Sequence, residues 1–422
     1  MDNRVVITGM GVVAPNAIGL DAFREAIKNG ISGIRRDPDL ERLDFSCQIA
    51  GKPQLPVELI SNYFSNLELR NFNSSGITYG VIAGIDAWKD AGLDLLMQEE
   101  PDWDSGTIFG TGTSGIDRFR EAIYKTDDMQ VRRLGSTVVA QTMASGVSAY
   151  LGGKLGLGNQ VTTNSSACIT GAESILMAYE RINSGKAVRM LAGSTSDSGP
   201  YIWGGFDAMK VCTYKHNDNP EAGSRPMSAS ASGFVPSSGA GALVLESLES
   251  ALARGARIYA EVLGGHVNSG GQRGTGSMTA PNSTAVQRCI KNAMKDAGID
   301  ASEIDAINGH LTATSKDALE IENWTIALER KGPDFPYINS LKSTVGHCLT
   351  ASGTIESIAS VLQVKEDFIF PNINCEDLNQ EIGALVDSER IPTKLVNKNI
   401  NIIAKASFGF GDVNACIIFK KY

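Results

Sequence analysis

Short apolar runs of strand length alternate with amphipathic runs along the whole chain. Near the start, "RVVITG" (4–9) precedes a stretch in which apolar residues recur every three to four positions (20–30). The second half repeats this order, with "RIYAEVLGG" (257–265), a helical pattern at 283–298 and a strand-like run at 399–410. This alternation predicts an α/β fold with buried, partly parallel strands.

Two segments resemble each other and predict an internal duplication. Residues 165–182 ("SSACITGAESILMAYERI") and 346–362 ("GHCLTASGTIESIASVL") both pass from a reactive residue through small residues and glycine into a helical pattern. We therefore divide the chain into two similar halves, 1–250 and 251–422. The first half carries a candidate nucleophile and the second carries candidate histidines.

Composition narrows the class of protein. The chain has 422 residues, 42% hydrophobic and 20% charged, which is long enough for two domain-sized units. A net charge of −9 argues against non-specific nucleic-acid binding. The seven scattered cysteines contain no C-x-x-C pair, which favours a reduced compartment over a disulfide framework or a zinc site. Because neither a signal peptide nor a membrane-spanning run is evident, we expect a cytoplasmic protein without a membrane partner.

The stretch "NSSACITG" (164–171) places one cysteine just ahead of a helical pattern. Ser165 or Ser166 is the expected N-cap of that helix. The first turn of a helix presents free N–H groups and partial positive charge, which lower the pKa of a thiol and favour a nucleophilic thiolate at Cys168. A small buried structural cysteine is the alternative.

Two of the four histidines stand where α/β proteins often place active-site residues. His310 and His347 each follow an apolar strand and precede a helical pattern. Lys342 precedes His347 by five positions and Glu356 follows it by nine. Either histidine taken alone also fits a structural role.

The glycine-rich stretch "GTGTSG" (110–115) fits the G-x-G-x-x-G pattern of dinucleotide-binding loops. The acidic residue that such a site needs about 20 positions further on is missing, since Asp127 and Asp128 come too early. We expect this backbone to pack against the catalytic cavity instead.

Four strings, taken in order, resemble the motifs of one enzyme family. They are "NSSACITG", "GHLTAT" (309–314), "INSLKSTVGH" (338–347) followed by "ASGTIES", and "SFGFGDVNACIIF" (407–419). Together they resemble the β-ketoacyl-acyl-carrier-protein synthases, in the elongating, decarboxylating Cys-His-His branch of the thiolase-like superfamily. The similarity spans nearly the whole chain. It implies a duplicated thiolase-like fold, layered α-β-α-β-α, with two mixed five-stranded sheets.

The resemblance implies a role for each matched residue, and no cofactor or metal. Cys168 is the expected acyl-accepting nucleophile, and His310 and His347 are the expected decarboxylation pair. Lys342 is similar to the family's active-site lysine, and Phe410 to the gatekeeper beside the acyl pocket. The expected reaction joins an acyl group on Cys168 to malonyl-acyl-carrier protein with loss of CO₂, as in fatty-acid chain elongation.

The chemistry of these groups fits that reaction independently. Thioester exchange needs a thiolate, and the N–H groups of Cys168 and Phe410 are the expected oxyanion hole for the tetrahedral intermediate. Loss of CO₂ from a malonyl thioester builds negative charge on its carbonyl oxygen. Two imidazole donors aimed at that oxygen stabilise the enolate without a metal.

Several positions depart from the family pattern. Thr312 and Thr314 match residues that contact the pantetheine arm of the substrate, but the loop 309–320 is one residue shorter than usual and has a leucine after the histidine. Residues 224–241 lack three charges usually found there, which suggests a neutral network in place of ion pairs. Residues 268–282 lack the usual acidic-aromatic-His run, so the loop facing the gatekeeper is expected to differ.

One departure concerns a bound ion. Many relatives hold a monovalent cation with an asparagine, a glutamate and a Ser-Asn pair, and here Asn308 and Glu356 remain while Lys405 and Ala406 replace the pair. Because an unpaired buried glutamate is costly, we expect the Lys405 ammonium to replace that ion and to pair with Glu356. We group Glu356 and Lys405 with the substrate-binding residues Thr312 and Thr314, and a surface lysine at a strand end is the alternative for Lys405.

The resemblance implies an acyl carrier protein as partner and a homodimer as assembly. Carrier proteins are acidic, so a basic patch is expected near the cavity entrance. Lys210 matches a basic contact residue of relatives. Arg132 and Arg133 are plausible neighbours, with a solvated helix face as their alternative.

Three alternative functions remain. A ketosynthase of a specialised polyene or polyketide pathway shares every catalytic residue. A degradative thiolase would use a second cysteine and coenzyme A, which the Cys-His-His pattern with Lys342 opposes. A non-catalytic subunit that only sets chain length would normally lack the cysteine at position 168.

Overall fold

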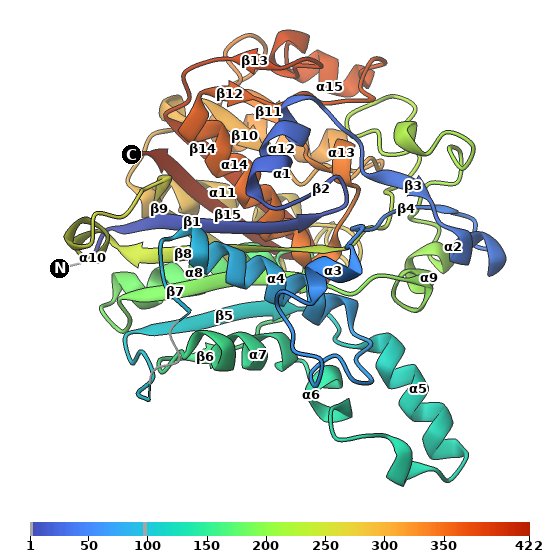
Figure 1. Cartoon of the computed structure of the whole chain (residues 1–422). Helices are drawn as coiled ribbons and strands as arrows, with labels where there is room; N and C mark the ends of the chain where they lie inside the picture. The colour runs from blue at the N-terminus through green and yellow to red at the C-terminus, as the bar shows by residue number, and fades with distance from the viewer. Residues whose placement is uncertain (1–2, 96–98) are drawn as a thin grey trace.

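The core of the molecule is a mixed β-sheet whose two halves have the same topology (Figure 1). The computed structural model describes residues 3–95 and 99–422. The strands of the first half are β1 (Val5–Ala14), β5 (Ser105–Thr111), β6 (Val161–Thr162), β7 (Arg189–Ser196) and β8 (Gly239–Ser247), and those of the second are β9 (Ala260–Ser269), β10 (Ala306–Asn308), β11 (Tyr337–Asn339), β14 (Ile402–Gly409) and β15 (Val413–Lys421). They are ordered β6-β5-β7-β8-β1 and β11-β10-β14-β15-β9.

Equivalent strands also pair in the same sense. β5 is parallel to β6 and β7, as β10 is to β11 and β14, and the next two pairings in each half are antiparallel. The expected class, a duplicated α/β fold with two mixed five-stranded sheets, is confirmed. The two sheets are joined at one edge, where β1 and β9 pair from Val5 opposite Val262 to Ile7 opposite Ala260.

Helices lie between the two sheets and on both outer faces. In the middle, α8 (Thr170–Asn183) packs on β5 and β7, and α14 (Ser352–Glu366) packs on β8 and β14. Every position of α14 from 352 to 364 is buried, as expected for a helix enclosed on all sides. α4 (Ser75–Asp90) covers the outer face of the first sheet and α11 (Ser283–Ala297) that of the second.

The two central helices meet at glycines near their N-termini. A Cβ on Gly171 would lie 2.5 Å from the nitrogen of Thr354, and one on Gly353 would overlap the nitrogen of Ala172. Only residues without a side chain permit this approach. The crossing brings together the turn that carries Cys168 and the turn that follows His347.

The remaining elements surround this core. They are α1 (Leu20–Lys28), α2 (Pro38–Arg42), α3 (Val57–Ile60), α5 (Ile116–Asp127), α6 (Val138–Thr142), α7 (Gly146–Leu155), α9 (Pro200–Ala208), α10 (Leu248–Ala253), α12 (Asp317–Leu328), α13 (Lys342–Val345), α15 (Gln380–Leu385), β2 (Ala17–Ile18), β3 (Ile34–Arg36), β4 (Ile49–Gly51), β12 (Phe368–Ile369), β13 (Val396–Asn397) and the 3₁₀ turn η1 (Val131–Arg133). The helical patterns predicted at 20–30 and 283–298 correspond to α1 and α11. No helix in the two described ranges is long and apolar enough to cross a membrane.

Candidate active site

Cys168 lies in a tight turn between β6 and α8. Ala167, which precedes it, has a φ of +49°, a left-handed conformation that is uncommon for alanine. The N–H of Ser166 donates to Oγ1 of Thr170 at 2.8 Å, and α8 begins at Thr170 without a side-chain cap. The prediction that Ser165 or Ser166 caps this helix is therefore wrong, because the turn separates both serines from the first helical residue. The turn places Cys168 in the wall of a cavity.

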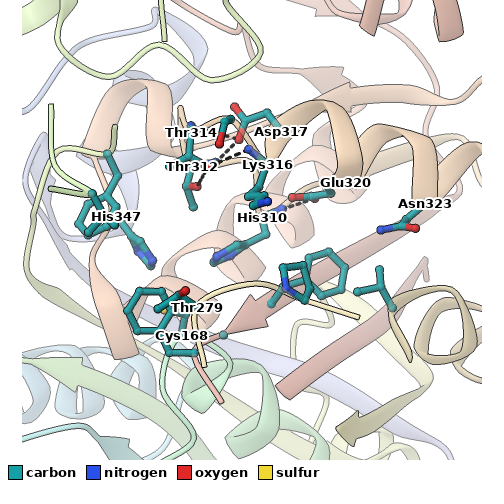
Figure 2. A pocket seen from close by; sticks show the side chains of 18 residues that line it. Cys168, Thr279, His310, Thr312, Thr314, Lys316, Asp317, Glu320, Asn323 and His347 are labelled. Carbon is teal, nitrogen blue, oxygen red and sulfur yellow. Dashed lines mark hydrogen bonds between the residues drawn. The ribbon is translucent and has the colours of Figure 1, made fainter. Parts of the chain in front are cut away.

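Two histidines from the second half of the chain face this cysteine. One heteroatom from each of Cys168, His310 and His347 lies within 4.8 Å of the others. The ring centroids of the two histidines are 5.3 Å apart and their planes are nearly perpendicular, at 83°. Figure 2 shows both rings directed toward Cys168. A single carbonyl group bound in this space is therefore within reach of all three.

Hydrogen bonds fix which ring nitrogen of His347 carries the proton. The backbone N–H of Leu349 donates to Nδ1 of His347 at 3.2 Å, and Oγ of Ser352 lies 3.0 Å from the same atom. Because Nδ1 accepts the backbone N–H, the proton of the neutral ring is on Nε2. His347 therefore offers an Nε2–H donor to the cavity.

His310 has the same arrangement with a different partner. Nζ of Lys342 lies 3.5 Å from Nδ1 of His310, and an ammonium group has only donors, so this Nδ1 also accepts. Burial, with Lys342 as the next contribution, holds the pKa of both His310 and His347 well below the usual range. Both imidazoles are neutral donors near neutral pH.

The thiol of Cys168 differs from the sequence-based expectation. Burial raises its pKa to about 11, although the Lys342 ammonium and the backbone N–H groups of Phe410 and Cys168 itself act in the opposite direction. The predicted lowering of this pKa is not observed, because desolvation of the thiol outweighs the favourable field at the helix N-terminus. The thiol is therefore protonated near neutral pH.

Behind the histidines, one carboxylate joins two ammonium groups. Oε1 of Glu356 contacts Nζ of Lys342, and its Oε2 lies 2.8 Å from Nζ of Lys405. All three side chains are at most 1% exposed. Lys405 thus points inward to Glu356 and not to solvent. Glu356 and Lys405 are not part of the cavity lining, so neither has the direct substrate contact that was expected.

Two further buried carboxylates hold the shortened loop after His310. Glu320 accepts the N–H groups of His310 and Leu311, both at 2.7 Å, and Asp317 accepts that of Thr312 at 2.9 Å. Burial raises the pKa of Asp317 to about 6 and that of Glu320 to about 7, against the effect of these N–H donors. Leu311 is fully buried in the core of the second half. These contacts hold the loop in place although it is one residue shorter than in the family pattern.

The cavity has a volume of about 280 Å³ and extends from the thiol past this loop. The predicted residues Thr312, Thr314 and Phe410 line it, and the two threonine hydroxyls are 3.1 Å apart. The sequence-based prediction missed other lining residues from distant segments, among them Val211, Phe234, Thr279, Lys316 and Asn323. No motif marks these residues, although Thr279 belongs to the segment 268–282, which departs from the family pattern.

The glycine-rich stretch 110–115 was predicted to pack against the catalytic cavity; it does not line the cavity but packs against segments next to the turns of Cys168 and His347. A Cβ on Gly110 would lie 2.5 Å from Oδ1 of Asn164, and one on Gly112 would lie 2.9 Å from Cγ2 of Thr350. Asn164 precedes the turn of Cys168, and Thr350 follows that of His347. The glycines therefore allow β5 to approach both turns closely.

The three predicted carrier-protein contacts come from two segments of the chain. Lys210 is exposed and directly precedes Val211, which lines the cavity. Arg132 and Arg133 lie in η1, between α5 and α6, in the segment that projects from the body of the molecule (Figure 1). Only Lys210 stands beside the cavity, whereas Lys316 is a further exposed cation in its lining.

The convergence of one thiol and two imidazoles also resembles a metal-binding set. The surroundings oppose a divalent cation, because the ammonium groups of Lys342 and Lys405 lie behind the imidazoles and would repel further positive charge. The site suits a substrate that develops negative charge.

Comparison with known proteins gives consistent matches over the chain. Residues 2–251 match the β-ketoacyl synthase N-terminal domain, and residues 259–376 match its C-terminal domain. The chain is 33% identical to 3-oxoacyl-[acyl-carrier-protein] synthase 1 of Escherichia coli over 99% of both chains. It is 32% identical to 3-oxoacyl-[acyl-carrier-protein] synthase 2 of Vibrio harveyi, covering 99% of this chain and 98% of that protein.

Solved structures agree with these matches. A β-ketoacyl synthase from Burkholderia phymatum superposes with a TM-score of 0.88 at 29% identity over the whole of both chains. A type II polyketide synthase ketosynthase, solved with its acyl-carrier protein and bound to a hexaketide, gives a TM-score of 0.87 at 27% identity, again over both whole chains.

Proposed function

The chain belongs to the β-ketoacyl synthase family, and from this premise we propose that it condenses an acyl group carried on Cys168 with malonyl-acyl-carrier protein. CO₂ is released and the product is a 3-oxoacyl-acyl-carrier protein, as in fatty-acid chain elongation. The observation that carries this proposal is the meeting of one thiol and two neutral imidazoles within 4.8 Å.

The first half-reaction transfers the acyl group to the enzyme. Sγ of Cys168, after losing its proton, attacks the thioester carbonyl of the acyl-carrier protein, and the carrier leaves as a free thiol. The backbone N–H groups of Phe410 and Cys168 both favour the thiolate form of Cys168. In our proposal they receive the oxyanion of the tetrahedral intermediate.

The second half-reaction forms the carbon–carbon bond. The malonyl thioester binds with its carbonyl oxygen between the Nε2–H groups of His310 and His347, and cleavage of the bond to the carboxylate releases CO₂ and leaves an enolate. The enolate carbon attacks the acyl carbonyl on Cys168, and collapse of that intermediate expels the thiolate. Neutral imidazoles suit this role because they donate to the developing charge without first having to lose a proton.

An acyl carrier protein is the proposed partner. Lys210 and the projecting Arg132 and Arg133 are offered as contacts for its acidic surface, and Thr312 and Thr314 as contacts for its pantetheine arm. The solved ketosynthase with its acyl-carrier protein supports this kind of partner. We also propose a homodimer, by analogy with relatives, and a reducing cytoplasmic setting, since Cys168 must remain a free thiol.

A ketosynthase of a specialised polyketide or polyene pathway is the second candidate. It is favoured by the similarity to a type II polyketide synthase ketosynthase and by the unusual segments 224–241 and 268–282. The chemistry is the same, so the two candidates differ only in the acyl chains accepted and in the carrier protein.

The test is to incubate the purified protein with malonyl-acyl-carrier protein and acyl-carrier proteins of several chain lengths, and to weigh the products. A product series of straight-chain 3-oxoacyl carriers supports fatty-acid elongation, and condensation restricted to polyketide or polyene intermediates supports the second candidate. Cys168→Ala should abolish acyl loading, whereas Cys375→Ala, which alters another buried thiol, should load normally. Loading that survives in Cys168→Ala, or wild-type protein that condenses none of these substrates, would refute the proposal.

A further inference from the structure

We propose that Lys405 is a positioning residue for the condensation: its ammonium is an internal cation that fills an oxygen-lined site behind Glu356 and holds Lys342 against His310. This inference rests on the proposed function. It concerns a residue that lies outside the cavity and acts only through other side chains.

The surroundings of Lys405 resemble the coordination of a cation by oxygen. Its Nζ lies 2.8 Å from Oε2 of Glu356 and 3.0 Å from Oγ of Ser407, and it donates to the carbonyl oxygen of Ala406. The side chain is fully buried. The ammonium group thus donates hydrogen bonds to two oxygens and forms an ion pair with a third.

Backbone pairing sets the position of this ammonium group. Lys405 lies in β14, where it is the register partner of Asn308 in β10. Asn308 donates to the backbone oxygen of Glu356 at 3.1 Å, and within the described chain its buried Oδ1 has no hydrogen-bond partner. His310 follows Asn308 by two residues. The ammonium group therefore comes from β14, and the catalytic histidine follows the end of the neighbouring strand β10.

Glu356 divides its two oxygens between the two lysines. Oε1 contacts Lys342 and Oε2 contacts Lys405, in a cluster that is closed to solvent. If the Lys405 ammonium is removed, half of a buried carboxylate loses its counter-charge, which is strongly unfavourable. Glu356 Oε2 is then free to turn toward Lys342, which Oε1 already contacts, and this would draw Lys342 away from its 3.5 Å contact with His310.

The net charge of the cluster also affects the pKa of the two histidines. Two ammonium groups and one carboxylate leave one net positive charge behind the imidazoles. Burial is the main cause of the low pKa values of His310 and His347, and Lys342 and Lys405 lower them further, so the rings stay neutral donors. The same positive charge favours the enolate that forms in front of them.

The test compares two substitutions of Lys405 in buffers whose only added cation is tetramethylammonium, which is too large for this site. In Lys405→Ala, acyl loading of Cys168 should stay near the wild-type rate, whereas CO₂ release from malonyl-acyl-carrier protein should fall by at least about tenfold, the scale typical of residues that act on a site through other groups. Adding K⁺ or methylammonium should restore most of that loss, because the truncated side chain leaves space among the same oxygens.

Lys405→Met and Lys365→Ala complete the design. Methionine removes the charge but fills the space, so its rate of CO₂ release should fall without recovery by either cation. Lys365 lies in α14, as Glu356 does, and its ammonium donates to the carbonyl of Ile258. Lys365→Ala should therefore release CO₂ at the wild-type rate in every buffer.

Three results would overturn the inference: wild-type CO₂ release by Lys405→Ala without added cation, a loss that neither cation restores, or an equal loss of acyl loading. Wild-type protein that fails to load or condense would instead refute the proposed function, so the two failures are distinguishable.

Discussion

A Cβ atom on Gly353 would overlap the backbone nitrogen of Ala172, at the crossing of the two central helices. This contact joins the N-terminal end of α14 to that of α8, and the catalytic turns precede both ends. The distance between Cys168 and His347 therefore depends on Gly353, a residue that takes no part in the reaction.

We expect Gly353→Ala to unfold at a lower temperature than the wild type and to lose condensation activity. The added methyl group forces the helices apart, and overpacking of this kind typically costs about 1–3 kcal/mol. The matched control is Gly153→Ala in α7, where a Cβ meets nothing within 4 Å. That change should be neutral or slightly stabilising, since alanine is favoured over glycine within a helix by about 0.5–1 kcal/mol. Thermal melts of both variants measure the difference, and equal melting temperatures would contradict the expected close packing.

The ring orientation of the histidines predicts which amide can replace them. The Nε2–H groups face the substrate, and the side-chain nitrogen of glutamine extends as far as Nε2, whereas that of asparagine reaches only to Nδ1. His347→Gln should therefore retain more CO₂ release than His347→Asn, while both should load acyl groups on Cys168. Loss of one such donor typically costs about 10²–10³-fold in rate. Release of labelled CO₂ from malonyl-acyl-carrier protein measures this order, and the reverse order would place the proton on Nδ1.

The raised pKa of Cys168, about 11, predicts how its alkylation depends on pH. Only the thiolate reacts, so the rate of inactivation by iodoacetamide should rise about tenfold per pH unit from about pH 7 to pH 10 without a plateau. Lys342→Met removes an ammonium that lowers this pKa, so alkylation should be slower than in the wild type at every pH. A plateau below about pH 8 would show that the thiolate is already formed in the free enzyme.

The raised pKa values of Asp317 and Glu320, about 6 and about 7, predict a pH-dependent stability. In the unfolded chain these carboxyls titrate near pH 4, so between about pH 4 and pH 7 the folded state binds more protons than the unfolded state. Stability contributed by the protonated groups is therefore lost as pH rises through that interval. Glu320→Gln removes one of the two titrating groups, so its melting temperature should fall less than that of the wild type between about pH 5 and pH 8. Parallel melting curves for the two proteins would contradict this assignment.

The sequence allowed the fold and the main site residues to be predicted because short motifs carried both. Cys168, His310 and His347 stand next to glycine-rich turns between strand-like and helical patterns, and the structure brings these three together. The duplication was visible in two helix-forming segments, and equivalent strand order in the two halves agrees with it. Lys405 was expected to face Glu356 because a buried carboxylate needs a partner, and the two are in contact.

Properties that depend on burial and on distant segments were not predictable. The pKa of Cys168 depends on how completely the cavity excludes water, which a local pattern does not encode. The tautomer of His347 depends on the backbone N–H of Leu349, and no residue type records where that group points. Thr279 and Lys316 enter the cavity from loops whose paths are set by tertiary packing.

The equivalent topology of the two sheets, joined along one short edge, has a consequence for how asymmetry arises. Two identical half-length chains related by a twofold axis would have to present the same residue in both catalytic turns, so a sulfur could never oppose an imidazole across the axis. Tethering both copies in one polypeptide removes that constraint, and each turn is then free to specialise.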